Sequence, residues 1–245
     1  MTKGLTLPSN YTTIQLDTVG STNQFLKDYV SEQQSLDPIV CITQKQTAGY
    51  GQQKRSWQTN QESAIFSIAY PLNSQDKMTG LVSLHIARLI HQCLIELTGD
   101  TLFLKWPNDI YNQQGKVAGI LIEQVIKKEY RCLIIGVGIN RNHTNLIDSA
   151  SSVSDFKTEE LIESFFEKIN LPGLVKFSIV ELLDYWKTHD LFSINQAIQL
   201  ITAEDIHSAQ AGFYQGITPQ GEALIKLNQK IQSLTSGQTS IRKQS

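Results

Sequence analysis

The segment LKWPNDIYNQQGKVAGILIE, from Leu104 to Glu123, places two lysines beside apolar runs. Lys105 ends one run and Lys116 precedes the other, with turn-forming residues between them. A lysine in a strand is usually a solvated edge residue, yet both of these flank stretches with the composition of buried strands. Two cationic side chains held next to buried strands indicate a pocket for an anionic group.

Three other polar clusters stand at positions where they can join such a pocket. Ser21-Thr-Asn23 follows an apolar run and, taken alone, is typical of a helix cap. The loop from Gln46 to Trp57 contains two glycines, Lys54 and Arg55. Gly136 to Asn140 ends an apolar run in a polar residue. None of these clusters is decisive alone, so the prediction depends on their combination and order.

Familiar nucleotide-binding motifs do not account for these residues. In Gly136-Val-Gly-Ile-Asn-Arg the third glycine of a dinucleotide-binding motif is replaced by Arg141, and no long helix follows. Gly115-Lys116 has Ile110 where a phosphate-binding loop requires a glycine, and a strand is expected after it. The sequence also has no Gly-x-Ser-x-Gly nucleophile motif.

Composition narrows the class of protein. The chain has 245 residues, of which 40% are hydrophobic, and its formal net charge is −2. It therefore has enough apolar surface for a large core and no overall basic field for nucleic acid. No apolar run reaches the length of a membrane span, and the N-terminal residues lack a signal peptide. The widely spaced cysteines and histidines show no metal-ligand spacing, so we expect a cytoplasmic protein without a metal cage.

The periodicity predicts an α+β fold. Alternating or apolar runs predict strands at residues 11–17, 38–43, 64–70, 102–105, 117–126 and 132–139, the last two forming a buried hairpin. Three-to-four spacing predicts one helix that begins at Ser21, where Gln24 completes a capping box, and further helices at residues 76–98, 158–169 and 173–189. Residues 44–60 and 141–155 are expected to form loops.

The residue pattern of the sequence changes after Asp190. Short alternating runs, separated by turn signals, continue towards the C-terminus and are typical of a small β-barrel. We therefore expect two domains: residues 1–192, which contain all four polar clusters, and residues 193–245, which form the barrel.

The motifs together resemble those of the biotin–protein ligases, which biotinylate acetyl-CoA carboxylase. The strongest is Lys105-Trp-Pro-Asn-Asp109 followed by Lys116-Val-Ala-Gly-Ile-Leu-Ile-Glu123. It is accompanied by the Ser-Thr-Asn turn, the loop that ends in Arg-Ser-Trp57, Gly-Val-Gly-Ile-Asn140 and the segments Gly216 to Leu224 and Ser236 to Arg242. The resemblance covers nearly the whole chain. It implies a mixed central sheet with flanking helices, related to the class II synthetases, plus an SH3-like barrel.

This resemblance implies a two-step reaction. The biotin carboxylate attacks the α-phosphate of ATP to give biotinyl-5′-AMP and pyrophosphate, and a lysine of a biotin carboxyl carrier protein domain then displaces AMP. Mg²⁺ is expected to arrive with ATP, held mainly by phosphate oxygens and water. Relatives pair through the central sheet, so a homodimer is one option. Only about ten residues precede the first strand, so a monofunctional ligase that binds neither DNA nor membrane is expected.

The resemblance also implies roles for four charged residues. Lys116 would reach the biotin carboxyl group and the α-phosphate, where it would stabilise the charge that develops as the anhydride forms. Lys105 and Arg55 would lie on the phosphate path. Asp109 would orient or deprotonate the acceptor lysine.

Further residues are implied to bind the substrates. Trp57 would stack on adenine, Gly119 would let the ligand approach the strand, and Asn108 and Asn140 would bind phosphate or ribose. The remaining residues implied to line the biotin and ATP sites are Ser21, Thr22, Asn23, Gln46, Gly49, Tyr50, Gly51, Gln52 and Gly138.

The loop departs from the pattern of the family. Relatives usually have Gly-Arg-Gly-Arg-x-Gly-Arg-x-Trp, whereas this chain has Gly49-Tyr-Gly-Gln-Gln-Lys-Arg-Ser-Trp57. Tyr50 and Gln52 therefore replace two arginines, and Lys54 is expected to restore part of the lost charge. Two alternatives stay open on the sequence alone: a lipoate or octanoate ligase of the same fold, and a non-catalytic biotin-binding regulator.

Overall fold

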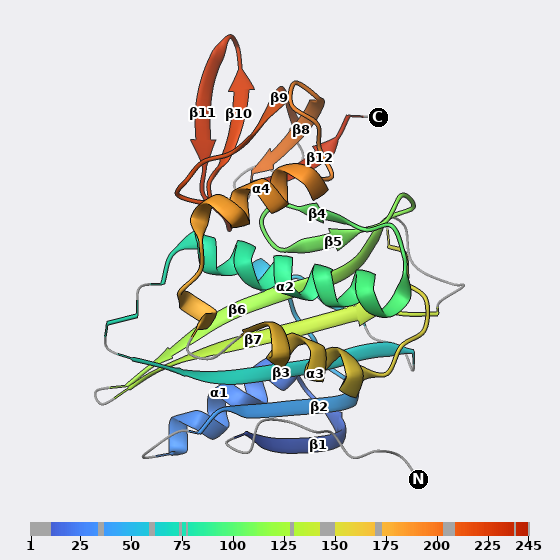
Figure 1. The fold of residues 1–245 in the computed structure, drawn as a ribbon, viewed down its shortest axis with the longest axis vertical. Helices are drawn as coiled ribbons and strands as arrows, with labels where there is room; N and C mark the ends of the chain where they lie inside the picture. Colours follow the sequence, from blue (N-terminus) through green and yellow to red (C-terminus); the bar gives the residue numbers. More distant parts are fainter. Residues whose placement is uncertain are drawn as a thin grey trace.

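The computed structural model describes residues 11–33, 37–58, 62–73, 75–76, 78–127, 130–142, 150–169, 173–202, 209–237 and 239–244. This part of the chain forms a seven-stranded sheet, a five-stranded sheet and four α-helices (Figure 1). Residues 143–149 of the expected loop at 141–155, and residues 1–10 before the first expected strand, lie outside the described residues.

The seven-stranded sheet follows the order β1-β2-β3-β7-β6-β5-β4. Its strands are β1 (Thr12–Val19), β2 (Ile39–Gln46), β3 (Ser63–Leu72), β4 (Phe103–Lys105), β5 (Asp109–Tyr111), β6 (Lys116–Ile126) and β7 (Arg131–Asn140). β1 pairs with β2 in parallel, and every other neighbouring pair is antiparallel. The predicted mixed sheet is therefore confirmed, and β6 and β7 form the predicted hairpin.

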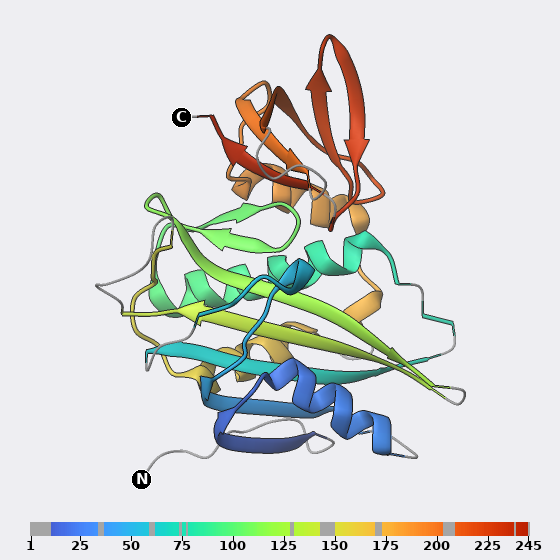
Figure 2. The same ribbon diagram turned by 180° about the vertical axis from the view of Figure 1, so that it is seen from behind.

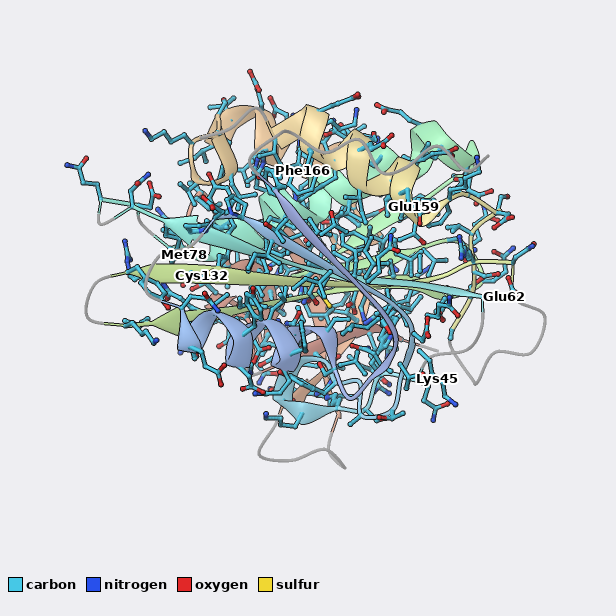
Figure 3. The ribbon with its side chains drawn as sticks, turned by 90° about the horizontal axis from the view of Figure 1, so that it is seen from below. Lys45, Glu62, Met78, Cys132, Glu159 and Phe166 are labelled. Atoms are coloured by element: carbon cyan, nitrogen blue, oxygen red, sulfur yellow. The ribbon has the colours of Figure 1, made fainter. Side chains whose placement is uncertain are left out.

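Helices cover both faces of this sheet. α1 (Thr22–Glu32) lies on one face, whereas α2 (Gly80–Thr98) and α3 (Thr158–Ile169) lie on the other (Figure 3). α4 (Ile179–His189) packs against α2 at the end nearest the second sheet (Figure 1). By length and composition alone α2 would suit a membrane span, but 61% of its apolar window is buried inside the fold. It serves here as the central core helix.

Local details differ from the predicted elements at several ends. α2 begins at Gly80 rather than residue 76, and the helix predicted from residue 173 divides into a 3₁₀ turn (Gly173–Val175) and α4, which Ser178 caps. At α1, Ser21 accepts a hydrogen bond from the Gln24 backbone as predicted, while the Gln24 amide donates to Asp28 one turn further on. β5 was not predicted, because three residues are too short for a periodic signal.

The second sheet follows the order β11-β10-β9-β8-β12 and is antiparallel throughout. Its strands are β8 (Ala197–Thr202), β9 (Ala209–Ile217), β10 (Ala223–Leu227), β11 (Lys230–Leu234) and β12 (Thr239–Lys243). This sheet agrees with the predicted SH3-like barrel. The buried Trp106 indole donates to the Gly221 carbonyl at 3.0 Å, which ties the turn between β4 and β5 to the second sheet. The domain boundary at residue 193 stays a prediction.

Candidate functional site

Strand register brings the predicted residues into one row across the large sheet. Lys105 pairs with Asp109, Asp109 with Gly119, Gly119 with Gly138, and Gly138 with Ile65. Directly paired residues in an antiparallel sheet point to the same face. The row therefore places a cation, a carboxylate, two glycines and Ile65 side by side. These residues come from positions between 65 and 138 of the sequence.

Two glycines of β7 make room for side chains that lie against the sheet. A Cβ atom at Gly138 would approach the Trp57 indole to 2.6 Å, and one at Gly136 would approach Asn23 Oδ1 to 2.2 Å. Both distances are far below van der Waals contact. The Gly-Val-Gly sequence thus has a packing explanation: one glycine accommodates Asn23 from α1, and the other accommodates Trp57 from the loop after β2.

The Ser-Thr-Asn turn forms the inner wall of the site. It joins β1 to α1, and the side chains of Ser21, Thr22 and Asn23 are buried. The Thr22 amide and hydroxyl both donate to Gln46 Oε1, at 2.8 and 3.1 Å. The Ser67 hydroxyl lies 2.7 Å from Thr22 Oγ1 and 2.6 Å from Asn23 Oδ1. Because buried polar groups cost free energy unless they are hydrogen-bonded, this network fixes each side chain in place.

The segment from Gly49 to Trp57 folds back on itself over the sheet. Trp57 N donates to Gly49 O, Gly51 N donates to Arg55 O, and a 3₁₀ turn (Gln52–Lys54) closes the tip. Figure 2 shows this segment crossing in front of β6 and β7. The Trp57 indole N–H is buried and has no hydrogen-bond partner among the described residues. It is therefore a donor that can serve a bound ligand.

Positive charge gathers at the end of the row next to the second sheet. Lys116 Nζ lies 2.6 Å from Asp109 and 5.5 Å from the centre of the Trp57 ring. Lys105 is buried, and its Nζ donates to the Tyr111 hydroxyl at 3.2 Å. Burial lowers the pKa of Lys105, Asp109 opposes this shift, and Arg242 and Arg55 add to it.

Lys116 and Lys105 thus lie next to Asp109, and Arg55 and Arg242 lie close enough to Lys105 to lower its pKa. Asp109 is the one carboxylate among the described residues that line the cavity. The net field at this end attracts anions.

A cavity of about 590 Å³ joins the inner wall to the cationic end. All but one of the residues predicted for the site line it: Ser21, Thr22, Asn23, Gln46, Tyr50, Gly51, Gln52, Arg55, Trp57, Lys105, Asn108, Asp109, Lys116, Gly119, Gly138 and Asn140. Gly49 lies behind the lining, where a Cβ atom would meet Gln46 Nε2 at 2.7 Å and Trp57 O at 2.8 Å. Lys54 is exposed, and its amine lies 4.7 Å from the centre of the Tyr50 ring.

Sequence reasoning missed several residues of the cavity wall. Gly136 was noted as the start of the Gly136 to Asn140 cluster but not predicted as a site residue, and Tyr111 was not singled out. Gly237, Thr239 and Ser240 reach the cavity from the second sheet. The sequence assigned them only to the segment Ser236 to Arg242 of the barrel, because their place in the cavity wall depends on how the two sheets pack. Among the described residues, no group of three or more His, Cys, Asp or Glu side chains could hold a metal ion.

The chain is similar to known proteins over most of its length. A family profile described as "Biotin/lipoate A/B protein ligase family" matches residues 16–140. The bifunctional ligase/repressor BirA of Escherichia coli is 28% identical over 245 aligned residues, covering 93% of this chain and 73% of the relative. A biotin–[acetyl-CoA-carboxylase] ligase of Mycobacterium tuberculosis is 31% identical over 135 residues, covering 51% of this chain and 49% of the relative. The biotin protein ligase from Aquifex aeolicus, in complex with biotin and ATP, matches with a TM-score of 0.77 at 26% identity, covering 95% of this chain and 99% of the other.

Proposed function

The chain belongs to the biotin/lipoate A/B protein ligase family, and from this premise we propose that it is a biotin–[acetyl-CoA-carboxylase] ligase. It activates biotin with ATP to biotinyl-5′-AMP and transfers the biotinyl group to a lysine of a biotin carboxyl carrier protein domain. The observation that carries the proposal is the polarity of the cavity. One end has neutral hydrogen-bonding groups, and the other has three cations in its lining, Lys105, Lys116 and Arg55, with a single carboxylate, Asp109.

The neutral end suits the ureido ring of biotin. Thr22, Asn23 and Gln46 offer hydroxyl and amide groups in a network that is already hydrogen-bonded, so little reorganisation is required when the ring binds. The buried walls beside them include Ile65 and Val137, which suit the apolar part of the ligand. The cavity volume of about 590 Å³ falls within the usual range for small-molecule sites.

The cationic end suits the reacting groups. Lys116 is held by Asp109 and is well placed to exchange this partner for the biotin carboxylate and the α-phosphate of ATP. As the carboxylate attacks, its ammonium group stabilises the crowded negative charge of the transition state. Lys105 and Arg55 bind the phosphates that leave as pyrophosphate, and Arg242 adds a further cation nearby. Mg²⁺ bound to the phosphates of ATP would neutralise part of their charge.

Asp109 is available for the second step. Once Lys116 has turned to the adenylate, the Asp109 carboxylate is free to orient the acceptor lysine or to take its proton. The amine then attacks the biotinyl carbonyl, an amide forms, and AMP leaves with the bonding electrons. Trp57 stacks on the adenine of the adenylate, with its unpaired indole N–H as an additional donor.

We further propose that the chain acts in the cytoplasm and does not bind operator DNA, for which its net charge of −2 gives no support. Residues 1–192 would form the catalytic domain and residues 193–245 the barrel. A homodimer through the central sheet remains one option, and analytical ultracentrifugation with and without biotin would decide it.

Biotin-dependent exchange of labelled pyrophosphate into ATP tests the proposal. Exchange that requires biotin supports it, and exchange with lipoate or octanoate in place of biotin supports an acyl ligase of the same fold. Tight biotin binding without exchange would identify a non-catalytic regulator and contradict the proposed activity. Transfer of the biotinyl group to a purified carrier domain, detected by mass spectrometry, tests the second step.

A further inference from the structure

The carboxylate of Glu123 connects three parts of the molecule beside the inner wall of the cavity. Glu123 belongs to β6, and its Oε2 accepts hydrogen bonds from the Tyr50 hydroxyl at 2.9 Å and from Asn23 Nδ2 at 3.0 Å. Its Oε1 lies 2.7 Å from Lys27 Nζ, on α1. The side chains of Lys27 and Glu123 are 20% and 23% exposed, so both are largely shielded from water. One acceptor group therefore joins the loop, the helix and the sheet.

Tyr50 is the member of this group that belongs to the loop over the cavity. It follows Gly49 directly, forms an isolated bridge with Ser56 at the start of the turned-back segment, and lines the cavity. The Lys27 and Lys54 amines lie 5.5 Å and 4.7 Å from the centre of the Tyr50 ring. The hydroxyl bond to Glu123 thus fastens the base of the loop to the sheet, whereas Trp57 rests on the sheet at the other end of the loop.

The protonation states favour a persistent bond. Burial tends to raise the pKa of Glu123, but hydrogen bonds from Lys27, Asn23 and Tyr50 outweigh it and hold that pKa below its ordinary value. Burial, together with the bond to Glu123, raises the pKa of Tyr50. At neutral pH the carboxylate is therefore ionised and the phenol is protonated. A bond between a neutral donor and a carboxylate is stronger than one between neutral groups.

We infer that Tyr50, Glu123 and Lys27 form a latch that keeps the segment from Gly49 to Trp57 closed over the neutral end of the cavity and slows the escape of bound biotinyl-5′-AMP. The inference rests on the proposed ligase function. It also replaces the charge-restoring role predicted for Lys54. Tyr50 stands where relatives usually have an arginine, and here a phenol contributes the fastening contact through a hydrogen bond rather than through its own charge.

The latch makes a specific prediction for Tyr50→Phe. This change keeps the ring and its contacts with the two lysines and removes only the hydroxyl. The dissociation rate of preformed biotinyl-5′-AMP, followed by chase with excess unlabelled biotin, should rise about tenfold, which corresponds to about 1.4 kcal/mol. Glu123→Gln and Lys27→Met should also raise the rate. The double variant Tyr50→Phe/Glu123→Gln should exceed neither single variant by more than about twofold, because all three changes break one latch.

Two controls separate the latch from general effects. Tyr29→Phe removes a phenol hydroxyl from α1, where the ring stacks on Phe25 away from the cavity, and should leave the dissociation rate unchanged. Lys54→Ala should change that rate by less than about twofold at both about 50 mM and about 300 mM salt, since its exposed charge is screened. A large, salt-sensitive effect of Lys54→Ala with no effect of Tyr50→Phe would overturn the latch in favour of charge compensation.

The readouts distinguish failure of the latch from failure of the proposed function. If the unchanged protein shows no biotin-dependent pyrophosphate exchange, the ligase function fails. If it shows exchange but Tyr50→Phe releases biotinyl-5′-AMP at the original rate, the latch alone fails. The melting temperature is measured for every variant. A rise in the dissociation rate that only parallels a loss of melting temperature, and that Tyr29→Phe shares, would identify a structural effect and also overturn the latch.

Discussion

Replacing Gly138 by alanine tests how the site positions its aromatic residue. The added Cβ atom would lie 2.6 Å from the Trp57 ring, so the ring has to move by roughly 0.8 Å to reach ordinary contact at 3.4 Å. Trp57 stands on a surface loop, and the ring therefore yields more easily than strand β7. Stacking of a base on an aromatic ring contributes about 1–3 kcal/mol. Loss of about half of this interaction, about 0.5–1.5 kcal/mol, should raise the KM for ATP by about two- to tenfold.

Folding stability should change little in the same variant. Alanine restricts the unfolded chain more than glycine does, which favours the folded state by about 0.4–1 kcal/mol and offsets part of the lost packing of the ring. We therefore expect a melting temperature within about 3 °C of the original. The steric argument also predicts a graded series. Gly119→Ala, whose nearest contacts lie at 3.1 Å, should affect ATP less than Gly138→Ala, and Gly20→Ala, with nothing within 4 Å, should have no effect.

The assay is pyrophosphate exchange at saturating biotin with varied ATP, supported by calorimetric titration of ATP. An unchanged KM for ATP in Gly138→Ala, with an unchanged melting temperature, would show that the position of the Trp57 ring against β7 is not used to bind ATP. Equal effects of alanine at Gly20 and Gly138 would refute the steric argument itself.

Three further predictions concern charge. Lys116→Ala should fold but lose about a hundredfold or more in adenylation rate, about 3 kcal/mol, because a cation aimed at developing charge is removed; near-normal pyrophosphate release would contradict its role. Burial raises the pKa of Asp190 to about 6 from 3.8, so stability that is present below about pH 4 is lost as the pH rises through about 6. Between about pH 4 and about pH 6 the unfolding free energy of the original protein should fall about 2–3 kcal/mol more than that of Asp190→Asn, as measured by denaturant titration. If the unfolding free energies of the two proteins changed in parallel with pH, this prediction would be wrong. No specific operator complex should survive roughly 150 mM salt with competitor DNA in a gel-shift experiment.

The sequence predicted the elements of the fold because each leaves a local signal. Three-to-four spacing identified α2 and predicted its end at residue 98, where the structure ends the helix before Gly99, a left-handed residue with a φ of 70°. Likewise, all but one of the residues that the motifs predicted for the site line the cavity. Prediction was less accurate at helix starts and for β5, where the local signal extends over only a few residues.

Contacts between distant segments left no such signal. The bond from Trp106 to Gly221 joins residues 115 positions apart, and the bond from Tyr50 to Glu123 spans 73 positions. The sequence pointed to the glycines of Gly136-Val-Gly138 but not to the reason for them. That reason is the packing of the Asn23 and Trp57 side chains against these two positions. Such reasons depend on strand register and on how the two sheets meet, and a single sequence specifies neither directly.

The distribution of charge around the cavity also favours one orientation of biotin in the proposed site. Two carboxylates lie close to the cavity, Asp109 in its lining and Glu123 beside its inner wall, and they differ in how they are neutralised. Glu123 accepts hydrogen bonds from Lys27, Tyr50 and Asn23, so the positive charge of Lys27 is already paired with Glu123. Asp109 faces Lys116, with Lys105, Arg55 and Arg242 close by. A biotin carboxylate placed near Glu123 would lose hydration and meet a like charge, whereas near Lys116 it meets excess positive charge. On the proposed function, the cations that stabilise the transition state would therefore also orient the substrate, with its carboxylate towards the α-phosphate.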